Sequence, residues 1–175
     1  YIFLLLTMFL VSYSVFSKEW RNIPYVSHNS ETNAYLIERG VLDIYCPEDN
    51  EKRPVIIWFH GGGLRSGEKN LPQRLLNQGV CVVSPNYRLY PKVKSPSYIE
   101  DAASAVAWVY KNIQNYGGDP SKIILSGHSA GGYLALMVGM DTQWLAKHDI
   151  NVNNLAALVP FSGHTVTHFT IREER

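Results

Sequence analysis

One stretch of sequence decides the fold: Lys122-Ile123-Ile124-Leu125-Ser126-Gly127-His128-Ser129-Ala130-Gly131-Gly132. Residues 123–125 are apolar and two of them are β-branched, as in a buried strand, and residues 130–140 are apolar and rich in glycine and alanine, as in a closely packed helix. The residues between them fit G-x-S-x-G, in which a serine is presented on a tight turn from strand to helix. A Cβ two residues before or after that serine would crowd the turn, so glycine is needed at both positions. We therefore predict that Ser129 is a nucleophile on a turn formed by Gly127, His128 and Gly131.

Apolar runs alternate with helical patterns on both sides of this stretch. Strands are predicted at 41–45, 54–59, 80–84, 123–125 and 155–159, helices at 71–78, 97–116 and 130–140, and a turn at 119–121. Apolar strands that alternate with helices form a parallel sheet covered by helices on both faces. The predicted fold class is α/β, a three-layer sandwich around a mostly parallel central sheet. In such sheets reactive groups gather at the carboxyl ends of the strands, which favours a nucleophile over a serine that only shapes a turn.

A second glycine-rich segment, His60-Gly61-Gly62-Gly63, follows the predicted strand at 54–59. Attack of a serine on an ester creates an oxyanion, which N–H donors must stabilise in a water-poor site. Consecutive glycines let a loop approach closely and turn its main-chain N–H groups inward. We predict an oxyanion hole formed by the N–H groups of Gly62, Gly63 and Ala130, the residue after the nucleophile.

His60 and Gly61 are expected to support this loop, and His60 is expected to brace it rather than to transfer protons. A flexible glycine loop and a phosphate cradle are the alternatives. A phosphate loop ends in Lys-Ser or Lys-Thr directly before a helix, and Leu64-Arg65-Ser66 does not provide that ending.

The chain resembles a known family through five segments in a fixed order. They are His60-Gly61-Gly62-Gly63, Tyr87-Arg88-Leu89-Tyr90-Pro91, residues 101–109, Gly117-Gly118-Asp119-Pro120 and Gly127-His128-Ser129-Ala130-Gly131-Gly132. Together they resemble the α/β-hydrolase carboxylesterases of bacteria that are related to hormone-sensitive lipase and to feruloyl and acetyl-xylan esterases, over residues 38–163. The resemblance implies ester hydrolysis through an acyl-serine intermediate and scaffold roles for Tyr87, Arg88, Asp101 and Asp119.

The mechanism also needs a histidine base and a carboxylate that orients it. In α/β-hydrolases the chain order is Ser, then Asp or Glu, then His. Asp141 and Asp149 precede His164 and His168, but in the family the acid and the histidine follow further strands of the sheet. We therefore expect both partners beyond the last residue, in a chain truncated at both ends with the C-terminal part of the fold missing. Residues 161–175 would begin a cap or lid, with His164 and His168 as surface or lid residues.

The N-terminus carries an apolar run at residues 2–11, and Val15 and Ser17 are small enough for a cleavage site before Lys18. We predict a signal peptide at 1–17, the N-terminal part of the hydrolase domain at 18–175, and a secreted or periplasmic protein without membrane insertion after cleavage. An uncleaved anchor or a buried helix is the alternative, although the run is short for a membrane span of about 20 residues.

Cys46 and Cys81 lie in or beside predicted strands and form no C-x-x-C pair, which argues against a zinc or thioredoxin-type site. They are expected to be small apolar core residues. A disulfide between them stays open, because the sequence does not give their separation.

Composition bears on the partners. The net charge is +1 and no cluster of Lys and Arg stands out, so no nucleic acid partner is expected. No H-E-x-x-H or tight His/Asp cluster appears, so no metal and no cofactor are expected. The predicted function is a serine hydrolase acting on small-molecule or carbohydrate-linked carboxylic esters. A serine peptidase of the same fold and a non-catalytic binding module are the alternatives.

Overall fold

The computed structural model describes residues 16–27, 33–49 and 51–174. The predicted leader therefore lies outside the described residues, except for Phe16 and Ser17. The elements in chain order are β1 (Ser17–Pro24), α1 (Ala34–Arg39), β2 (Val41–Pro47), β3 (Arg53–Phe59), η1 (Gln73–Leu75), β4 (Cys81–Pro85), α2 (Ser97–Asn112), η2 (Ile113–Tyr116), β5 (Gly118–His128), α3 (Ala130–Met140), α4 (Thr142–Ala146), η3 (Val152–Asn154), β6 (Ala157–Phe161) and α5 (Phe169–Glu173).

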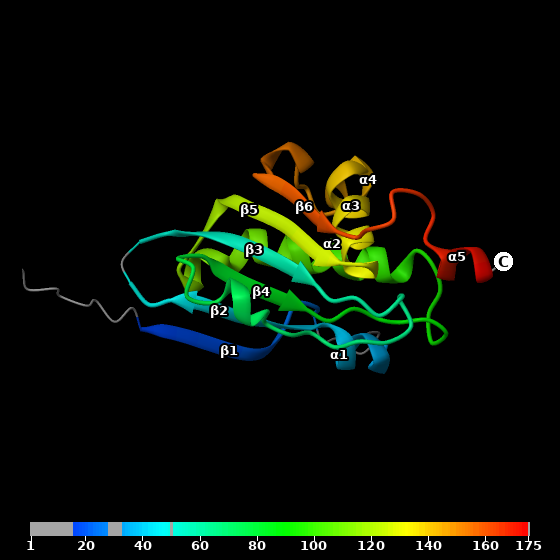
Figure 1. Cartoon of the computed structure of the whole chain (residues 1–175), viewed down its shortest axis with the longest axis horizontal. Helices are drawn as coiled ribbons and strands as arrows, with labels where there is room; N and C mark the ends of the chain where they lie inside the picture. The colour runs from blue at the N-terminus through cyan, green and yellow to red at the C-terminus, as the bar shows by residue number, and fades with distance from the viewer. Residues whose placement is uncertain (1–15, 28–32, 50, 175) are drawn as a thin grey trace, which may run out of the picture.

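The six strands of the described residues form one sheet in the order β1-β2-β4-β3-β5-β6 (Figure 1). β4, β3, β5 and β6 run parallel, β2 pairs with β4 in antiparallel orientation, and β1 pairs with β2 in antiparallel orientation. The predicted α/β class with a mostly parallel sheet is confirmed. Strand β1 was not predicted, because its residues are almost all exposed and carry no apolar alternation.

The parallel strands bring both glycine-rich segments to one edge of the sheet. Phe59, the last residue of β3, pairs with Gly127 of β5, and Gly127 pairs with Pro160 of β6. The loop at 60–63 and the turn at Ser129 therefore begin side by side at the carboxyl ends of these strands. Figure 1 shows that α5 also lies beyond these ends.

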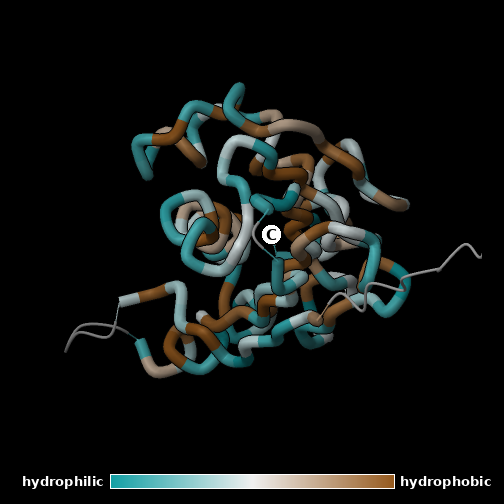
Figure 2. Tube along the Cα trace, turned by 90° about the vertical axis from the view of Figure 1, so that its left-hand side faces the viewer, coloured by the Kyte–Doolittle hydropathy of each residue, from teal (hydrophilic) through white to brown (hydrophobic). Residues whose placement is uncertain are grey.

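Helices α2 and α3 pack against each other and onto the sheet. The predicted apolar face of α2 is buried at Ile99, Ala102, Ala103, Val106 and Val109. The predicted helix at 97–116 tightens into η2 at Ile113 and ends at Gly117, whose φ of 93° is in the left-handed region that favours glycine. Figure 2 shows hydrophobic stretches in the middle of the molecule and also along parts of its outline, between hydrophilic turns.

The opposite face of the sheet is covered over β2 and β4 by the segment that contains η1. Leu71 and Leu76 pack there against Tyr45 and Val82. Over β3 and β6 this face is more open, and Phe161 remains 51% exposed.

Two local predictions are wrong. The helix predicted at 71–78 is only the short turn η1, because Asn77 takes a φ of 59° and its N–H donates to the Tyr45 hydroxyl instead of continuing a helix. The turn predicted at 119–121 lies within β5, where the pairing slips between Gly118 and Ile123. The strand predicted at 155–159 is found two residues later, as β6.

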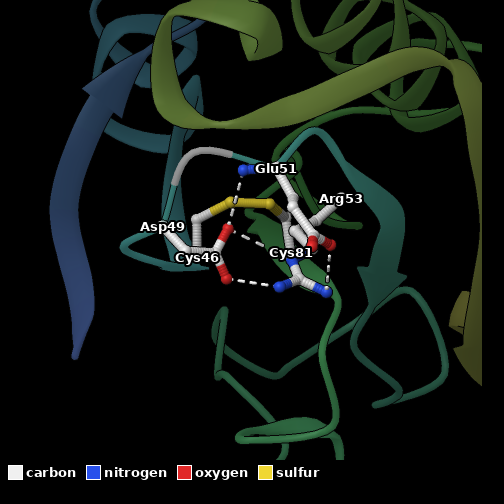
Figure 3. The surroundings of a disulfide bond; sticks show 5 residues. All are labelled: Cys46, Asp49, Glu51, Arg53 and Cys81. Carbon is white, nitrogen blue, oxygen red and sulfur yellow. Dashed lines mark hydrogen bonds and ion pairs between the residues drawn. A yellow bond between two sulfur atoms is a disulfide. The ribbon is translucent and has the colours of Figure 1, made fainter. Parts of the chain in front are cut away.

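Cys46 and Cys81 are both buried and joined by a disulfide (Figure 3). They face each other across β2 and β4, with 4.2 Å between their Cα atoms. The core location predicted for both cysteines holds, and the open question of their pairing is answered. Beside the disulfide, Arg53 forms ion pairs with Asp49 and Glu51.

Reduction of this disulfide is expected to lower the free energy of unfolding by about 3–4 kcal/mol, because the bond closes a loop of 35 residues in the unfolded chain. Urea denaturation with and without dithiothreitol measures the difference. A double variant, Cys46→Ala with Cys81→Ala, serves as the control and should not respond to the reductant. An equal response of the variant and the wild type would contradict the prediction.

Candidate active site

Ser129 sits at the junction of β5 and α3, with a φ of 55° and a ψ of −117°. Such a backbone costs about 1–3 kcal/mol for a residue with a Cβ and persists only where the surroundings impose it. Here the N–H of Ser129 donates to the carbonyl of Phe161 at 2.8 Å, and its own carbonyl accepts from the N–H of Tyr133 at 3.0 Å. The residue is only partly buried, so the turn presents it at the surface of the sheet edge.

The glycines on either side of Ser129 are required by the packing of β3 against this turn. A Cβ on Gly131 would lie 2.0 Å from the carbonyl oxygen of Phe59, and one on Gly127 would lie 2.6 Å from the same oxygen. Both distances are far below any real contact. His128, the third predicted residue of the turn, is exposed.

The loop at 60–63 lies directly beside this turn. A Cβ on Gly61 would meet the carbonyl oxygen of His128 at 3.1 Å and the Cβ of Ser129 at 3.6 Å. The structure therefore brings together the two segments that the sequence assigned to the nucleophile and to the oxyanion hole.

Hydrogen bonds from neighbouring residues hold the carbonyl groups of Gly61 and Gly62 in the loop. Nδ1 of His60 lies 2.7 Å from the carbonyl oxygen of Gly61. The carbonyl oxygen of Gly62 accepts from the N–H groups of Arg65 and Ser66, each at 3.1 Å, and from the Ser66 hydroxyl at 3.2 Å. Each carbonyl shares a planar trans peptide with the N–H of the next residue, which points the opposite way. The orientations of the Gly62 and Gly63 N–H groups are thereby fixed.

These N–H groups have no acceptor among the described residues. The third predicted donor, Ala130, is the first residue of α3, so its N–H has no partner within the helix. A helix N-terminus also favours nearby negative charge. The site thus offers fixed, unpaired donors at the edge where Ser129 is presented.

His60 is buried beneath the loop. Its ring stacks on Tyr87 with 4.3 Å between centroids, and the Tyr87 hydroxyl donates to the His60 carbonyl at 2.8 Å. Burial lowers the pKa of His60 to about 4, so the ring is neutral at pH 7. With Nδ1–H donating to Gly61, Nε2 is left as an acceptor toward Arg39, 3.5 Å away. These contacts are those of a residue that supports the loop.

Arg39 is a supporting residue that sequence reasoning missed. It is 5% exposed, donates to the carbonyls of Tyr87 and Gly67 at 3.0 Å each, and pairs with Glu68. It comes from the short helix α1, more than twenty residues before the loop. No periodicity or motif marks it in the sequence.

Stability should depend on the protonation of His60. Because its folded pKa lies below the ordinary value of 6.5, the unfolded chain binds the proton more tightly. The contribution is complete above pH 6.5 and is lost as the pH falls toward 4. We expect the free energy of unfolding to drop by about 2–3 kcal/mol from this group between pH 7 and pH 4.5.

Urea denaturation at the two pH values tests this, with His60→Gln compared with His128→Gln, which alters an exposed histidine. His60→Gln should flatten the pH dependence while His128→Gln retains it. His168, whose pKa burial also lowers to about 4, contributes in the same direction and is unchanged in both variants. Equal pH dependence in the two variants would show that His60 is not responsible.

The other predicted scaffold residues form buried or local polar contacts. Asp101 is 3% exposed and accepts two hydrogen bonds from the Arg88 guanidinium, at 2.7 and 2.8 Å, and one from the Arg88 N–H at 2.9 Å. Asp119 accepts from the N–H and the hydroxyl of Ser121, and these bonds lower the pKa of its carboxyl.

Within the described residues, no hydrogen bond joins the Ser129 hydroxyl to a histidine. Asp141 caps α4, accepting from the N–H of Gln143 at 3.2 Å. His164 is exposed, as predicted. His168 was also expected to be a surface or lid residue, but it is fully buried, because its ring packs between Tyr133 and Phe169.

The described residues also contain no group of three or more His, Cys, Asp or Glu side chains that could hold a metal ion.

A sequence model of the protein family described as BD-FAE matches residues 42–166, well over half of the chain and the range that holds both glycine-rich segments. The chain belongs to the BD-FAE family. The carboxylesterase resemblance expected from the motifs is thereby confirmed at the level of the family and the α/β-hydrolase fold.

Relatives of this BD-FAE chain include named esterases. A probable isoprenylcysteine alpha-carbonyl methylesterase of Oryza sativa subsp. japonica is 38% identical over 102 residues, which cover 55% of this chain and 24% of the relative. Esterase LipQ of Mycobacterium tuberculosis is 37% identical over 109 residues, covering 58% and 26%.

Solved structures give the same picture. Esterase B from Lactobacillus rhamnosis superposes with a TM-score of 0.70 at 25% identity, over 84% of this chain and 48% of that one. A truncated carbohydrate esterase from gut microbiota gives a TM-score of 0.63 at 28% identity, over 76% and 47%. The BD-FAE chain thus spans about a quarter of the length of these curated relatives and about half of these structures.

None of the described helices is long and apolar enough for a membrane span.

Proposed function

We propose that this BD-FAE chain carries the nucleophile and the oxyanion hole of a serine esterase. One observation supports this above all others: a serine in a strained turn lies beside a loop whose N–H groups are fixed and unpaired. A binding module has no need to maintain a strained serine at this position.

In the proposed reaction, the Ser129 oxygen attacks the ester carbonyl while a base takes its proton. The carbonyl oxygen becomes an oxyanion and receives hydrogen bonds from Gly62, Gly63 and Ala130. The bond to the alcohol then breaks, the alcohol leaves with the proton, and an acyl-serine remains. Water attacks the acyl-serine in the same way and releases the acid.

Among the described residues, no histidine is hydrogen-bonded to the Ser129 hydroxyl, so neither the base nor the acid that orients it is assigned there. We propose that a histidine preceded by an Asp or Glu, in the chain order of this fold, supplies them from outside the described part. Activity is therefore to be measured on the full-length protein.

The proposed substrates are small-molecule or carbohydrate-linked carboxylic esters. The names of relatives support this class, since they include a methylesterase and a carbohydrate esterase. A serine peptidase of the same fold is the second candidate, because acyl transfer from an amide uses the same groups.

A paired assay of the full-length protein tests the proposal and separates these candidates. p-Nitrophenyl acetate and butyrate serve as ester substrates, and acyl p-nitroanilides of the same chain lengths serve as amides. The proposal expects turnover of the esters with little or none of the anilides. Preference for the anilides would favour the peptidase, and turnover of neither would favour a binding module.

We also propose that the protein is exported. The apolar N-terminal run of the sequence supports this, and so does the disulfide between Cys46 and Cys81, because disulfides persist mainly in oxidising compartments. N-terminal sequencing of the protein recovered from culture medium or periplasm tests it, with a mature chain expected to begin at Lys18.

A further inference from the structure

Helix α5 contacts the predicted oxyanion loop across a long separation in sequence. The Thr170 hydroxyl donates to the carbonyl of Gly63 at 2.5 Å, and the two residues are 107 positions apart. The Phe169 ring lies where a Cβ of Gly63 would point, 3.3 Å from that position. Gly63 is thus held by a hydrogen bond on its carbonyl and by an aromatic ring against its Cα.

The contacts around α5 fix its place. Thr170 is buried, and its N–H donates to Nδ1 of the buried His168 at 3.2 Å. At the other end of the helix, the Glu174 carboxylate accepts from the Tyr98 hydroxyl at 2.7 Å and from the Ser95 N–H at 2.9 Å. Both ends of the helix are therefore tied to the body of the protein.

The three glycines of the loop differ in what holds their carbonyls. Those of Gly61 and Gly62 are bound by residues of the loop and its own turn, from His60 to Ser66. The carbonyl of Gly63 is bound by Thr170. Gly63 has a φ of 65° and the conformational freedom of glycine. Without Thr170, the Gly63 carbonyl would lose its one hydrogen-bond partner among the described residues, while the next residue, Leu64, would still be held by the Tyr90 N–H on its carbonyl at 2.8 Å.

We propose that Thr170 is a positioning residue for the oxyanion hole, with Phe169 as the second contact that holds Gly63. The inference rests on the proposed function of the loop. Oxyanion donors contribute most when they are already in place before reaction. The Gly62 carbonyl already sets the direction of the Gly63 N–H, so Thr170 and Phe169 act on where Gly63 lies relative to Ser129. A Gly63 that can shift must be brought back into place in the transition state, which lowers kcat more than it raises KM.

Thr170→Val removes the hydroxyl and keeps the shape of the side chain, whereas Thr170→Ser keeps a hydroxyl. Thr167→Val alters an exposed threonine of the same segment and serves as the control. In the full-length protein, we expect Thr170→Val to lower kcat for p-nitrophenyl butyrate by about tenfold with KM changed less than about twofold. A trifluoromethyl ketone that forms a tetrahedral adduct should bind the variant weaker by the same factor as kcat/KM falls. Thr170→Ser should recover most of the loss, and Thr167→Val should match the wild type.

Phe169→Ala gives a second test that does not depend on the buried threonine, because Phe169 is 45% exposed. It should lower kcat by about threefold with the melting temperature nearly unchanged. A wild-type kcat in both Thr170→Val and Phe169→Ala would overturn the positioning role of Thr170 and Phe169. A loss of kcat in Thr170→Val that is not recovered in Thr170→Ser would overturn it as well. Ester hydrolysis by Ser129→Ala at the wild-type rate would overturn the proposed function itself, and the positioning role of Thr170 and Phe169 with it.

Discussion

Ser129→Ala is expected to lower kcat/KM for p-nitrophenyl esters by about 10⁴-fold or more in the full-length protein, because it removes the hydroxyl on which the acyl intermediate is proposed to form. Folding should be preserved or slightly improved. Alanine removes only the hydroxyl, and that hydroxyl has no hydrogen-bond partner among the described residues. Steady-state kinetics, with circular dichroism to verify the fold, measures the effect.

Ser162→Ala is the matched control. Ser162 is also a serine with positive φ, 51°, and it follows the carboxyl end of the neighbouring strand β6, but it is exposed and outside the glycine motif. It should retain activity close to that of the wild type. Similar losses in the two variants would mean that the sheet edge is sensitive to any change, and would remove the special role of Ser129.

Gly62→Ala should produce the next largest loss of activity. Gly62 has a φ of 114°, and a Cβ there would lie 2.1 Å from the carbonyl oxygen of Ser66. To relieve this clash the turn from Gly62 to Ser66 must open, which releases the Gly62 carbonyl and turns the Gly63 N–H away. The expected loss in kcat is about 10²–10³-fold, the effect of removing one oxyanion donor, with a small change in KM.

Gly79→Ala separates this effect from the general cost of a Cβ at positive φ. Gly79 has a φ of 71°, but a Cβ there would meet only the Arg53 guanidinium at 3.8 Å, at the opposite end of β4 from the site. It should lose some stability and keep its kcat. If Gly62→Ala kept its kcat as well, the loop would not be the oxyanion hole.

The part of the fold nearest the chemistry could be predicted from the sequence because it obeys local rules. The strand and helix around Ser129 show apolar runs of the right length, and the turn between them needs glycine at two fixed positions. The face of α2 follows a helical period. Such patterns arise because one face of a helix, or both faces of a strand, must be apolar where they are buried, and these segments are buried in the structure.

The remainder depends on contacts between distant residues that leave no pattern. Strand β1 is mostly exposed, and only Trp20 and Ile23 pack against the core, so its side chains show no alternating pattern that would mark a strand. The buried Arg39 beneath the loop acts through several polar contacts, and Thr170 acts through one hydrogen bond to the carbonyl of Gly63, in both cases with partners far away in the sequence. The disulfide needed the register of β2 against β4, which places Cys46 opposite Cys81.

Peptide mapping after covalent labelling tests most directly whether Ser129 is the nucleophile. The full-length protein is treated with a fluorophosphonate, digested and examined by mass spectrometry. We predict one adduct, on the peptide and residue of Ser129, with no such adduct after denaturation before labelling. An adduct on another serine, or an unlabelled Ser129 in protein that hydrolyses esters, would contradict the account.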